Sequence, residues 1–184
     1  MDATTLSKAA GISMPRARQW AQPLTAAMAH FDIDTPIRQA AFIPQVGHES
    51  GGFLYTREIW GPTPAQRGYE GRADLGNTQP GDGKRFMGRG LIQITGRANY
   101  AEAGAALGLD LVKFPQLIET DDDIAALTAA WFWSKRGLNA LADRGDFLGI
   151  SIRINGKNKT TGLPNGWPDR QSRWLTAKLA LGVR

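Results

Sequence analysis

The amino-acid sequence predicts a mainly α-helical fold of a single domain that forms two lobes around a cleft. The chain has 184 residues, of which 42% are hydrophobic and 21% charged, an ordinary composition for one globular domain. Apolar residues recur at helical spacing in several segments whose ends carry helix start and stop residues. Between these segments, residues 51–83 are so rich in glycine and proline that we expect a hairpin and loops there.

The first helices are indicated by their start signals. Thr35 followed by Pro36 predicts a helix start. Residues 1–34 precede it and are expected to form N-terminal helices that pack on the rest of the chain. Pro23 should split or kink the longer of these, because proline removes a backbone donor and clashes with the preceding turn. We therefore expect one domain over 1–184, with 35–184 as its core.

Helices are also predicted in the second half of the chain. Thr95 would be the N-cap of one helix, and another would begin near Asp121, where acidic side chains suit the positive end of the helix dipole. The Lys-Arg-Gly sequence at 135–137 predicts the end of that helix. The last helix would start at Pro168 and bury a face formed by Trp174, Leu175 and Leu179.

Composition excludes several chemistries. The chain has no cysteine, which rules out disulfides, thiolate metal sites and cysteine nucleophiles. It has only two histidines and no G-x-S-x-G segment, so we expect no metal site, no serine nucleophile and no cofactor. No apolar run reaches the roughly 18 residues of a membrane span, and no secretory signal is visible, so stable membrane insertion is not expected.

The net charge of +5 and the sequence pI of about 9.8 favour an anionic partner. Nucleic acid, a membrane surface and an acidic polymer all fit that charge. The basic residues are dispersed and form no run of the length that a nucleic-acid-binding arm shows, so nucleic acid is not the expected partner.

Carboxylates are the remaining candidates for catalysis. Glu49 ends a largely apolar helix, and Glu58 follows nine residues later. In one continuous helix the two would lie on opposite faces, with roughly 13 Å of axial rise between them. Gly51-Gly52 break the helix, so the chain can turn back and bring Glu58 over Glu49, at the separation of about 6.5–9.5 Å that an inverting glycosidase requires. Glu70, in a glycine-rich loop, is an equally good partner, and ordinary ion pairs or surface positions would also explain these carboxylates.

Further polar and aromatic residues would accompany the carboxylates at such a site. Helix capping explains Thr95 and Asn155 without any function, and this is the simplest interpretation of both. Trp60 lies two residues after Glu58 and is the tryptophan best placed to stack on a sugar. The polar candidates, grouped by neighbouring position, are Gln93 and Thr95, Asn99 and Tyr100, and Asn155.

Taken together, these segments resemble the catalytic domain of glycoside hydrolase family 19, which contains plant and bacterial chitinases and a group of bacteriophage endolysins. The resemblance covers roughly residues 35 to 182 and implies a lysozyme-like, mainly helical fold with two lobes and a small β-hairpin beside the cleft. Six segments carry it in the family's order: His48-Glu49-Ser50-Gly51-Gly52, Arg57-Glu58, the sequence GRGLIQIT at 88–95, Asn99-Tyr100, Ile154-Asn155-Gly156 and Asp169-Arg170.

The resemblance also implies a role for each matching residue. Glu49 would be the general acid, Glu58 the general base, and Thr95 would help to hold the attacking water. Between Asn155 and Arg170, plant chitinases have a glutamate, whereas this chain has no acidic residue except Asp169. The ion pairs around Arg170 must therefore differ from those of the plant enzymes. The expected substrate-binding residues are Gln93, Asn99, Tyr100, Asn155 and Arg170. Arg170 matches an arginine that is buried near the general acid in the family. Trp60 is added to them from its position in the sequence alone.

The expected function is that of an endolysin, an inverting lysozyme-type N-acetylmuramidase that hydrolyses the β-1,4 bonds of bacterial peptidoglycan. Its partner would be the glycan strands of the wall, and it would act as a monomer. Such an enzyme would accumulate in the host bacterial cytoplasm and reach the wall after membrane permeabilisation. A chitinase acting on N-acetylglucosamine polymer is the first alternative, and a non-catalytic basic module that binds cell wall or nucleic acid is the alternative from another class.

Overall fold

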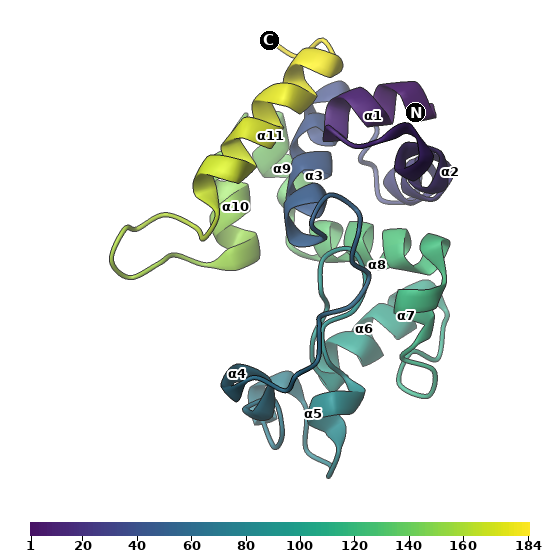
Figure 1. The fold of residues 1–184 in the computed structure, drawn as a ribbon, viewed down its shortest axis with the longest axis vertical. Coiled ribbons are helices and arrows are strands. Elements are labelled where there is room, and N and C mark those ends of the chain that lie inside the picture. The colour runs from purple at the N-terminus through teal and green to yellow at the C-terminus, as the bar shows by residue number, and fades with distance from the viewer.

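A computed structural model describes all 184 residues, and the fold is mainly helical, as predicted (Figure 1). None of its helices combines the length and the apolarity needed to cross a lipid bilayer. The elements in chain order are α1 (Ala3–Ala10), α2 (Met14–His30), α3 (Pro36–Glu49), α4 (Pro64–Arg67), the 3-10 helix η1 (Ala73–Leu75), α5 (Asp82–Arg85), α6 (Arg97–Leu107), α7 (Leu117–Thr120), α8 (Asp122–Lys135), α9 (Leu138–Asp143), α10 (Phe147–Asn155) and α11 (Trp167–Ala180).

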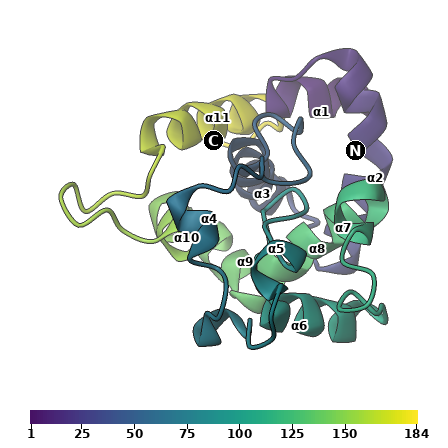
Figure 2. The same cartoon turned by 60° about the horizontal axis from the view of Figure 1, so that its bottom comes forward.

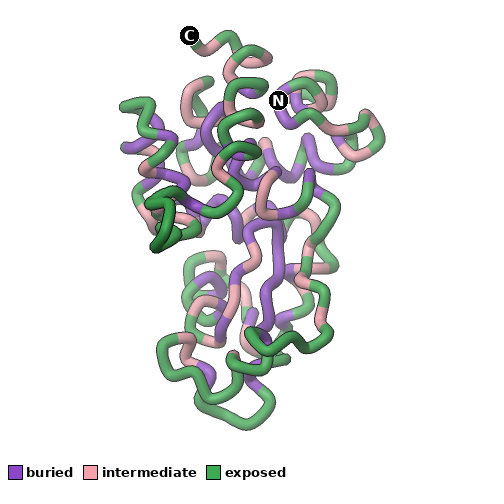
Figure 3. The backbone as a smooth tube through the Cα atoms, turned by 60° about the vertical axis from the view of Figure 1, so that its left-hand side comes forward, coloured by how far each residue is buried: buried purple, intermediate pink, exposed green.

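The helices form two lobes (Figures 1 and 2). In the larger lobe, α3 packs against α1, α9 and α11. The smaller lobe contains α4, η1, α5 and α6, and α8 joins the two because it contacts α2 and α9 as well as α6 and α7. Buried backbone continues from one lobe into the other, and 36 buried hydrophobic residues form one connected core (Figure 3).

The helix that carries the first predicted carboxylate begins and ends where the sequence predicts. Thr35 caps α3 by accepting a hydrogen bond from a backbone amide one turn later, and Pro36 is its first residue. The helix ends at Glu49 because Gly51 and Gly52 have φ values of 61° and 77°, in the left-handed region that glycine enters without strain. The chain therefore reverses directly after the carboxylate.

The predicted β-hairpin is not confirmed, since the structure contains two isolated antiparallel bridges in place of strands. Arg89 bridges both Arg57 and Ile94, so three short segments are linked through one residue. Gly90, at φ 76°, turns the chain between Arg89 and Ile94, so the paired segments stay short. The rest of the glycine-rich stretch forms the expected loops. It also forms the short helices α4, η1 and α5, which were not expected.

An ion pair with a buried carboxylate links two helices of the smaller lobe. Asp82 at the start of α5 is 1% exposed and accepts two hydrogen bonds from the Arg97 guanidinium, at 2.8 and 2.6 Å. Those bonds lower the pKa of the Asp82 carboxyl, against the opposing effect of its burial. Because Arg97 is the first residue of α6, this pair fixes α6 against α5.

The helix that follows the bridged segments starts one residue later than predicted. Gly96 is the N-cap of α6, whereas the Thr95 hydroxyl donates to the Gln93 carbonyl at 3.0 Å, so the predicted capping role of Thr95 is wrong. At φ 94°, Gly96 adopts a backbone conformation that threonine would enter only with strain. The prediction for α8 is confirmed: Asp121 caps its first turn, and the helix ends at Lys135.

Two further expectations about helices differ from the structure. Pro23 lies inside α2, which continues past it, so a split of this helix is wrong and a kink stays a prediction. The predicted buried face of α11 is wrong for Leu175 and Leu179, which are 58% and 86% exposed, whereas Trp174 is partly buried and stacks on Phe147. Arg170 and Ala177 are buried instead, at the seven-residue spacing that keeps two residues on one side of a helix. The face that meets α3 is therefore partly polar, and this polar part forms the site described next.

Candidate active site

Glu49 lies at the end of α3 and faces a pocket between the lobes. Its side chain is 19% exposed, and the pocket has a volume of about 270 Å³. The lining comes from both lobes, since η1 and α6 contribute from one side and α8 and α10 from the other. The polar side chains that line it with Glu49 are Gln93, Thr95, Asn99, Arg136 and Asn155, four of which were predicted site residues.

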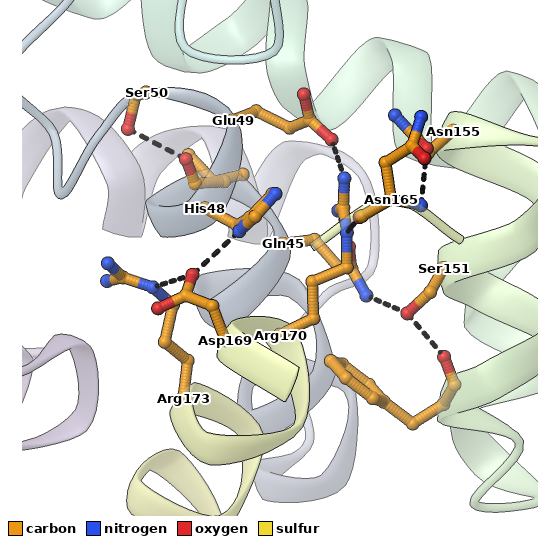
Figure 4. A network of polar contacts seen from close by, with 12 residues as sticks. Gln45, His48, Glu49, Ser50, Ser151, Asn155, Asn165, Asp169, Arg170 and Arg173 are labelled. Carbon is orange, nitrogen blue, oxygen red and sulfur yellow. Dashed lines mark hydrogen bonds and ion pairs between the residues drawn. The ribbon is translucent and has the colours of Figure 1, made fainter. Parts of the chain in front are cut away.

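One oxygen of Glu49 is fixed by a buried guanidinium (Figure 4). Arg170 donates to Glu49 Oε1 at 2.5 Å, to the Gln45 side-chain oxygen, and from Nε to the Asn165 carbonyl at 3.0 Å. Gln45 then donates to the Ser151 hydroxyl at 2.6 Å. Gln45, Ser151 and Arg170 are fully buried, so this chain of bonds is sealed from solvent and links α3, α10 and α11.

These contacts bear on two expectations. Glu49 ends a largely apolar helix, but the nearest partner of its carboxylate is a guanidinium. Arg170 is completely buried beside Glu49, as the resemblance implies, and because all three of its bonds go to protein oxygens it is not exposed to contact a substrate directly. Glu49 Oε2 makes no hydrogen bond within the protein, which leaves one carboxyl oxygen free in the pocket.

His48, next to Glu49, ties the end of α3 to the first turn of α11. Its Nδ1 lies 2.6 Å from Asp169 Oδ2, which also accepts from Arg173 at 2.7 Å (Figure 4). Partial burial opposes ionisation of Asp169, but the bonds from His48 and Arg173 lower the pKa of its carboxyl. Because Arg170 follows Asp169 directly, this contact helps to place the guanidinium against Glu49.

Glu58 lines a separate groove on the smaller lobe, with a volume of about 510 Å³. Its Oε1 accepts from the Gly88 amide at 2.6 Å, and its Oε2 accepts from the Gln66 side chain at 2.9 Å. Trp60 lines the same groove and packs against Tyr69, with 6.3 Å between ring centroids. Burial and the neighbouring Glu58 raise the pKa of the Tyr69 hydroxyl.

Gly88 connects the two pockets. Its amide binds Glu58, and a side chain built on its Cα would lie 3.0 Å from Gln93 Oε1 and 3.3 Å from Thr95 Oγ1. Gln93 and Thr95 line the pocket of Glu49, so the absence of a side chain at Gly88 keeps open the space beside them. Glu49 and Glu58 thus do not share one pocket, but lie in neighbouring pockets on either side of Gly88.

The amide groups of the Glu49 pocket are positioned by their neighbours. Asn99 donates to the Thr95 carbonyl at 2.7 Å, and Asn155, the last residue of α10, accepts from the Asn165 amide at 2.9 Å. Gln93 has a positive φ of 55° and donates to the Gly90 carbonyl at 2.9 Å. Its Oε1 is buried without a partner, the only side-chain atom of this kind in the protein, so its capacity to accept a hydrogen bond is unused.

Two other predicted residues lie outside both pockets. Tyr100 is fully buried, and its hydroxyl donates to the Met87 carbonyl at 2.6 Å, so the prediction that it binds substrate is wrong. The aromatic ring fills the core of the smaller lobe, where the hydroxyl also accepts from Arg89. Glu70 accepts from the amides of Gly81 and Gly83 at 2.6 and 2.8 Å and so stabilises the loop around α5. Of the two candidate bases, only Glu58 lies beside Gly88.

Several functional-site residues were not predicted from the sequence. Gln45 is four residues before Glu49, and this i, i+4 spacing on one helix face was a signal that could have found it. Ser151, Asn165, Gln66 and Arg136 had no such signal, because their partners lie on other elements. No cluster of three or more side chains suited to a metal ion occurs in the structure.

Fold and site together define a lysozyme-like protein with a carboxylate on each side of a glycine between two lobes. The sequence profile described as chitinase class I, of glycoside hydrolase family 19, matches residues 21–140. The chain belongs to glycoside hydrolase family 19.

Individual relatives agree with this assignment. An endochitinase of Arabidopsis thaliana is 37% identical over 144 residues, which are 78% of this chain and 48% of the relative. A glycosyl hydrolase family 19 domain-containing protein of Haemophilus influenzae is 33% identical over 65% of this chain and 71% of the relative. The chain spans about half the length of the plant endochitinase.

Solved structures show the same fold. Chitinase C from Streptomyces griseus superposes with a TM-score of 0.72 at 26% identity, covering 88% of this chain and 83% of that chain. The family 19 class IV chitinase from Zea mays gives a TM-score of 0.71 at 25% identity, covering 91% and 82%. The lysozyme-like architecture expected from the sequence is therefore confirmed.

Proposed function

We propose that this protein hydrolyses β-1,4 bonds between N-acetylated sugars, with Glu49 as general acid and Glu58 as general base. The observation that carries the proposal is the position of the two carboxylates on either side of Gly88, beside Gln93 and Thr95. Family membership supports it, because the relatives are named as chitinases and glycosyl hydrolases.

The proposed reaction uses each group at a defined atom. Glu49, held through Oε1 by Arg170, would donate a proton from its free Oε2 to the leaving glycosidic oxygen as the C–O bond breaks. A water placed by Glu58 and the Thr95 hydroxyl would attack the anomeric carbon from the other face, and Glu58 would accept its proton. The product would have the inverted anomeric configuration.

Bacterial peptidoglycan is the proposed substrate. The net charge of +5 supports an anionic polymer, and the groove of Glu58 carries two exposed cations, Arg57 and Lys84. The resemblance to the endolysin branch supports a role as a monomer that lyses its host bacterium from the cytoplasm once the membrane is permeabilised. Chitin is the second candidate, favoured by the names of the plant and bacterial relatives.

The test is mass spectrometry of purified peptidoglycan and of colloidal chitin after digestion by the wild type and by Glu49→Gln. We expect the wild type to release muropeptides with new reducing ends and Glu49→Gln to release none at an unchanged circular dichroism spectrum. If the wild type released fragments from chitin but none from peptidoglycan, chitin would replace peptidoglycan as the proposed substrate. No cleavage of either polymer, with salt-sensitive binding of DNA, would refute the catalytic function and favour a basic binding module.

A further inference from the structure

The pocket of Glu49 contains a cation that the proposed reaction does not use. Arg136 follows the last residue of α8, and its guanidinium carbon lies 3.6 Å from the centroid of the Phe132 ring. Both residues line the pocket together with Glu49 and Asn155. The guanidinium is thus held over an aromatic ring at the edge of the candidate active site.

This guanidinium has no anionic partner in the protein. Glu49, the acidic residue of the pocket, is bound by Arg170, and Arg136 forms neither an ion pair nor a side-chain hydrogen bond. Partial burial lowers the pKa of Arg136 with no neighbouring charge to offset it, yet an arginine remains charged at any physiological pH. A partly buried charge without a counter-ion is unfavourable, and an anionic group on a ligand would relieve this.

The geometry suits a carboxylate. The Phe132 ring lies under the guanidinium carbon, and none of the guanidinium N–H donors has a hydrogen-bond partner in the protein, so they are available to a ligand. Two parallel N–H donors match the two oxygens of a carboxylate. Neutral hydroxyl and acetamido groups can accept one of these bonds but cannot neutralise the charge.

We propose that Arg136 is a carboxylate-binding subsite, which selects glycans that carry a carboxylate on a substituent close to the cleaved bond. The inference rests on the proposed glycosidase function and narrows its substrate class to acid-substituted glycans. Two sources supply that chemistry in peptidoglycan, the lactyl group of muramic acid and the stem peptide attached to it. Arg57, the arginine that lines the groove of Glu58, differs because it already faces Glu119 at 3.6 Å.

The test compares Arg136→Met and Arg136→Lys with Arg18→Met, a matched control that removes the same charge from an exposed position of α2. The substrates are a tetrasaccharide of alternating N-acetylglucosamine and N-acetylmuramic acid, its stem-peptide form, the methylamides of both, and neutral chitotetraose. We expect Arg136→Met to lower kcat/KM about 10- to 100-fold on whichever charged tetrasaccharide, with or without the stem peptide, carries the carboxylate that Arg136 binds. On the methylamides the decrease should be less than about twofold. Arg136→Lys should retain part of the preference, and Arg18→Met all of it.

A binding measurement separates failure of this inference from failure of the proposed function. In a Glu49→Gln background, titration calorimetry should show the charged tetrasaccharides binding about tenfold more weakly when Arg136 is also replaced by methionine. Cleavage of the glycans with the same Arg136→Met effect on charged and amidated forms would overturn the subsite and leave the glycosidase function intact. Arg136-dependent binding without cleavage by the wild type would support the subsite and refute the catalytic function.

Discussion

Replacement of Gln45 by leucine tests whether the buried network positions the proposed acid. Gln45 touches no pocket, but its side chain accepts from Arg170 and donates to Ser151. Leucine has a similar volume and no polar atoms, so the variant removes both bonds without leaving a large cavity. Arg170 keeps only Glu49 and the Asn165 carbonyl as partners.

The expected loss follows from the burial of Arg170. Its side chain is 1% exposed, so water cannot replace the missing acceptor. A hydrogen bond to a charged group contributes about 1.5–3 kcal/mol, and we expect Gln45→Leu to lower the free energy of unfolding by about 2–3 kcal/mol. For a chain of this size that corresponds to a decrease in Tm of roughly 4–12 °C.

The assay combines thermal unfolding with steady-state hydrolysis well below Tm. We expect kcat to fall about tenfold with little change in KM, because Gln45 acts on the orientation of Glu49 through Arg170 and touches no substrate. Gln39→Leu is the control on the same helix, since it loses only the bonds of a neutral amide to backbone oxygens and should retain full activity. Wild-type stability and kcat in Gln45→Leu would refute the positioning role.

Four further variants test the site and the smaller lobe. Glu58→Gln should lower kcat more than about 100-fold and Glu70→Gln less than about threefold, and equal losses would refute the assignment of the base. Thr95→Val should lower kcat about tenfold through loss of a bond to the attacking water, and an unchanged kcat would remove that role. Asp82→Asn should cost about 3 kcal/mol in urea unfolding at pH 7. The bonds from Arg97 lower the pKa of Asp82, so the stability they provide is present above the unfolded-state pKa of about 3.9 and is lost as pH falls through the folded-state pKa. The loss of stability in acid should therefore be smaller in Asp82→Asn than in the wild type. The same pH dependence in both proteins would contradict this role of the ion pair.

The local part of the fold could be predicted from the sequence. Caps and glycines act within a few residues, so the start of α3 at Pro36, its end before Gly51 and the start of α8 after Asp121 were correctly predicted. The hairpin and the buried face of α11 were not, because they depend on which segments meet. Leu179 fits a buried helical pattern, yet α3 packs on the side of α11 that carries Arg170 and Ala177.

The same distinction applies to the site. Glu49, Gln93, Thr95, Asn99 and Asn155 were predicted, and the structure brings all five to one pocket. The support behind them could not be predicted, since the bonds of Gln45 join residues 106 and 125 positions apart. Tyr100 was predicted to bind substrate because it follows Asn99 in the same motif, but its side chain points into the core of the smaller lobe. The motif does not say which of two neighbouring side chains faces the pocket.

The anomeric configuration of the first product tests the central claim most directly. A general base that activates water on the face opposite to Glu49 requires inversion, so proton NMR during the first minutes of hydrolysis should show the α-anomer at the new reducing end. Initial formation of the β-anomer would mean that a carboxylate or the sugar's own acetamido group attacks the anomeric carbon, and would contradict the roles given to Glu49 and Glu58.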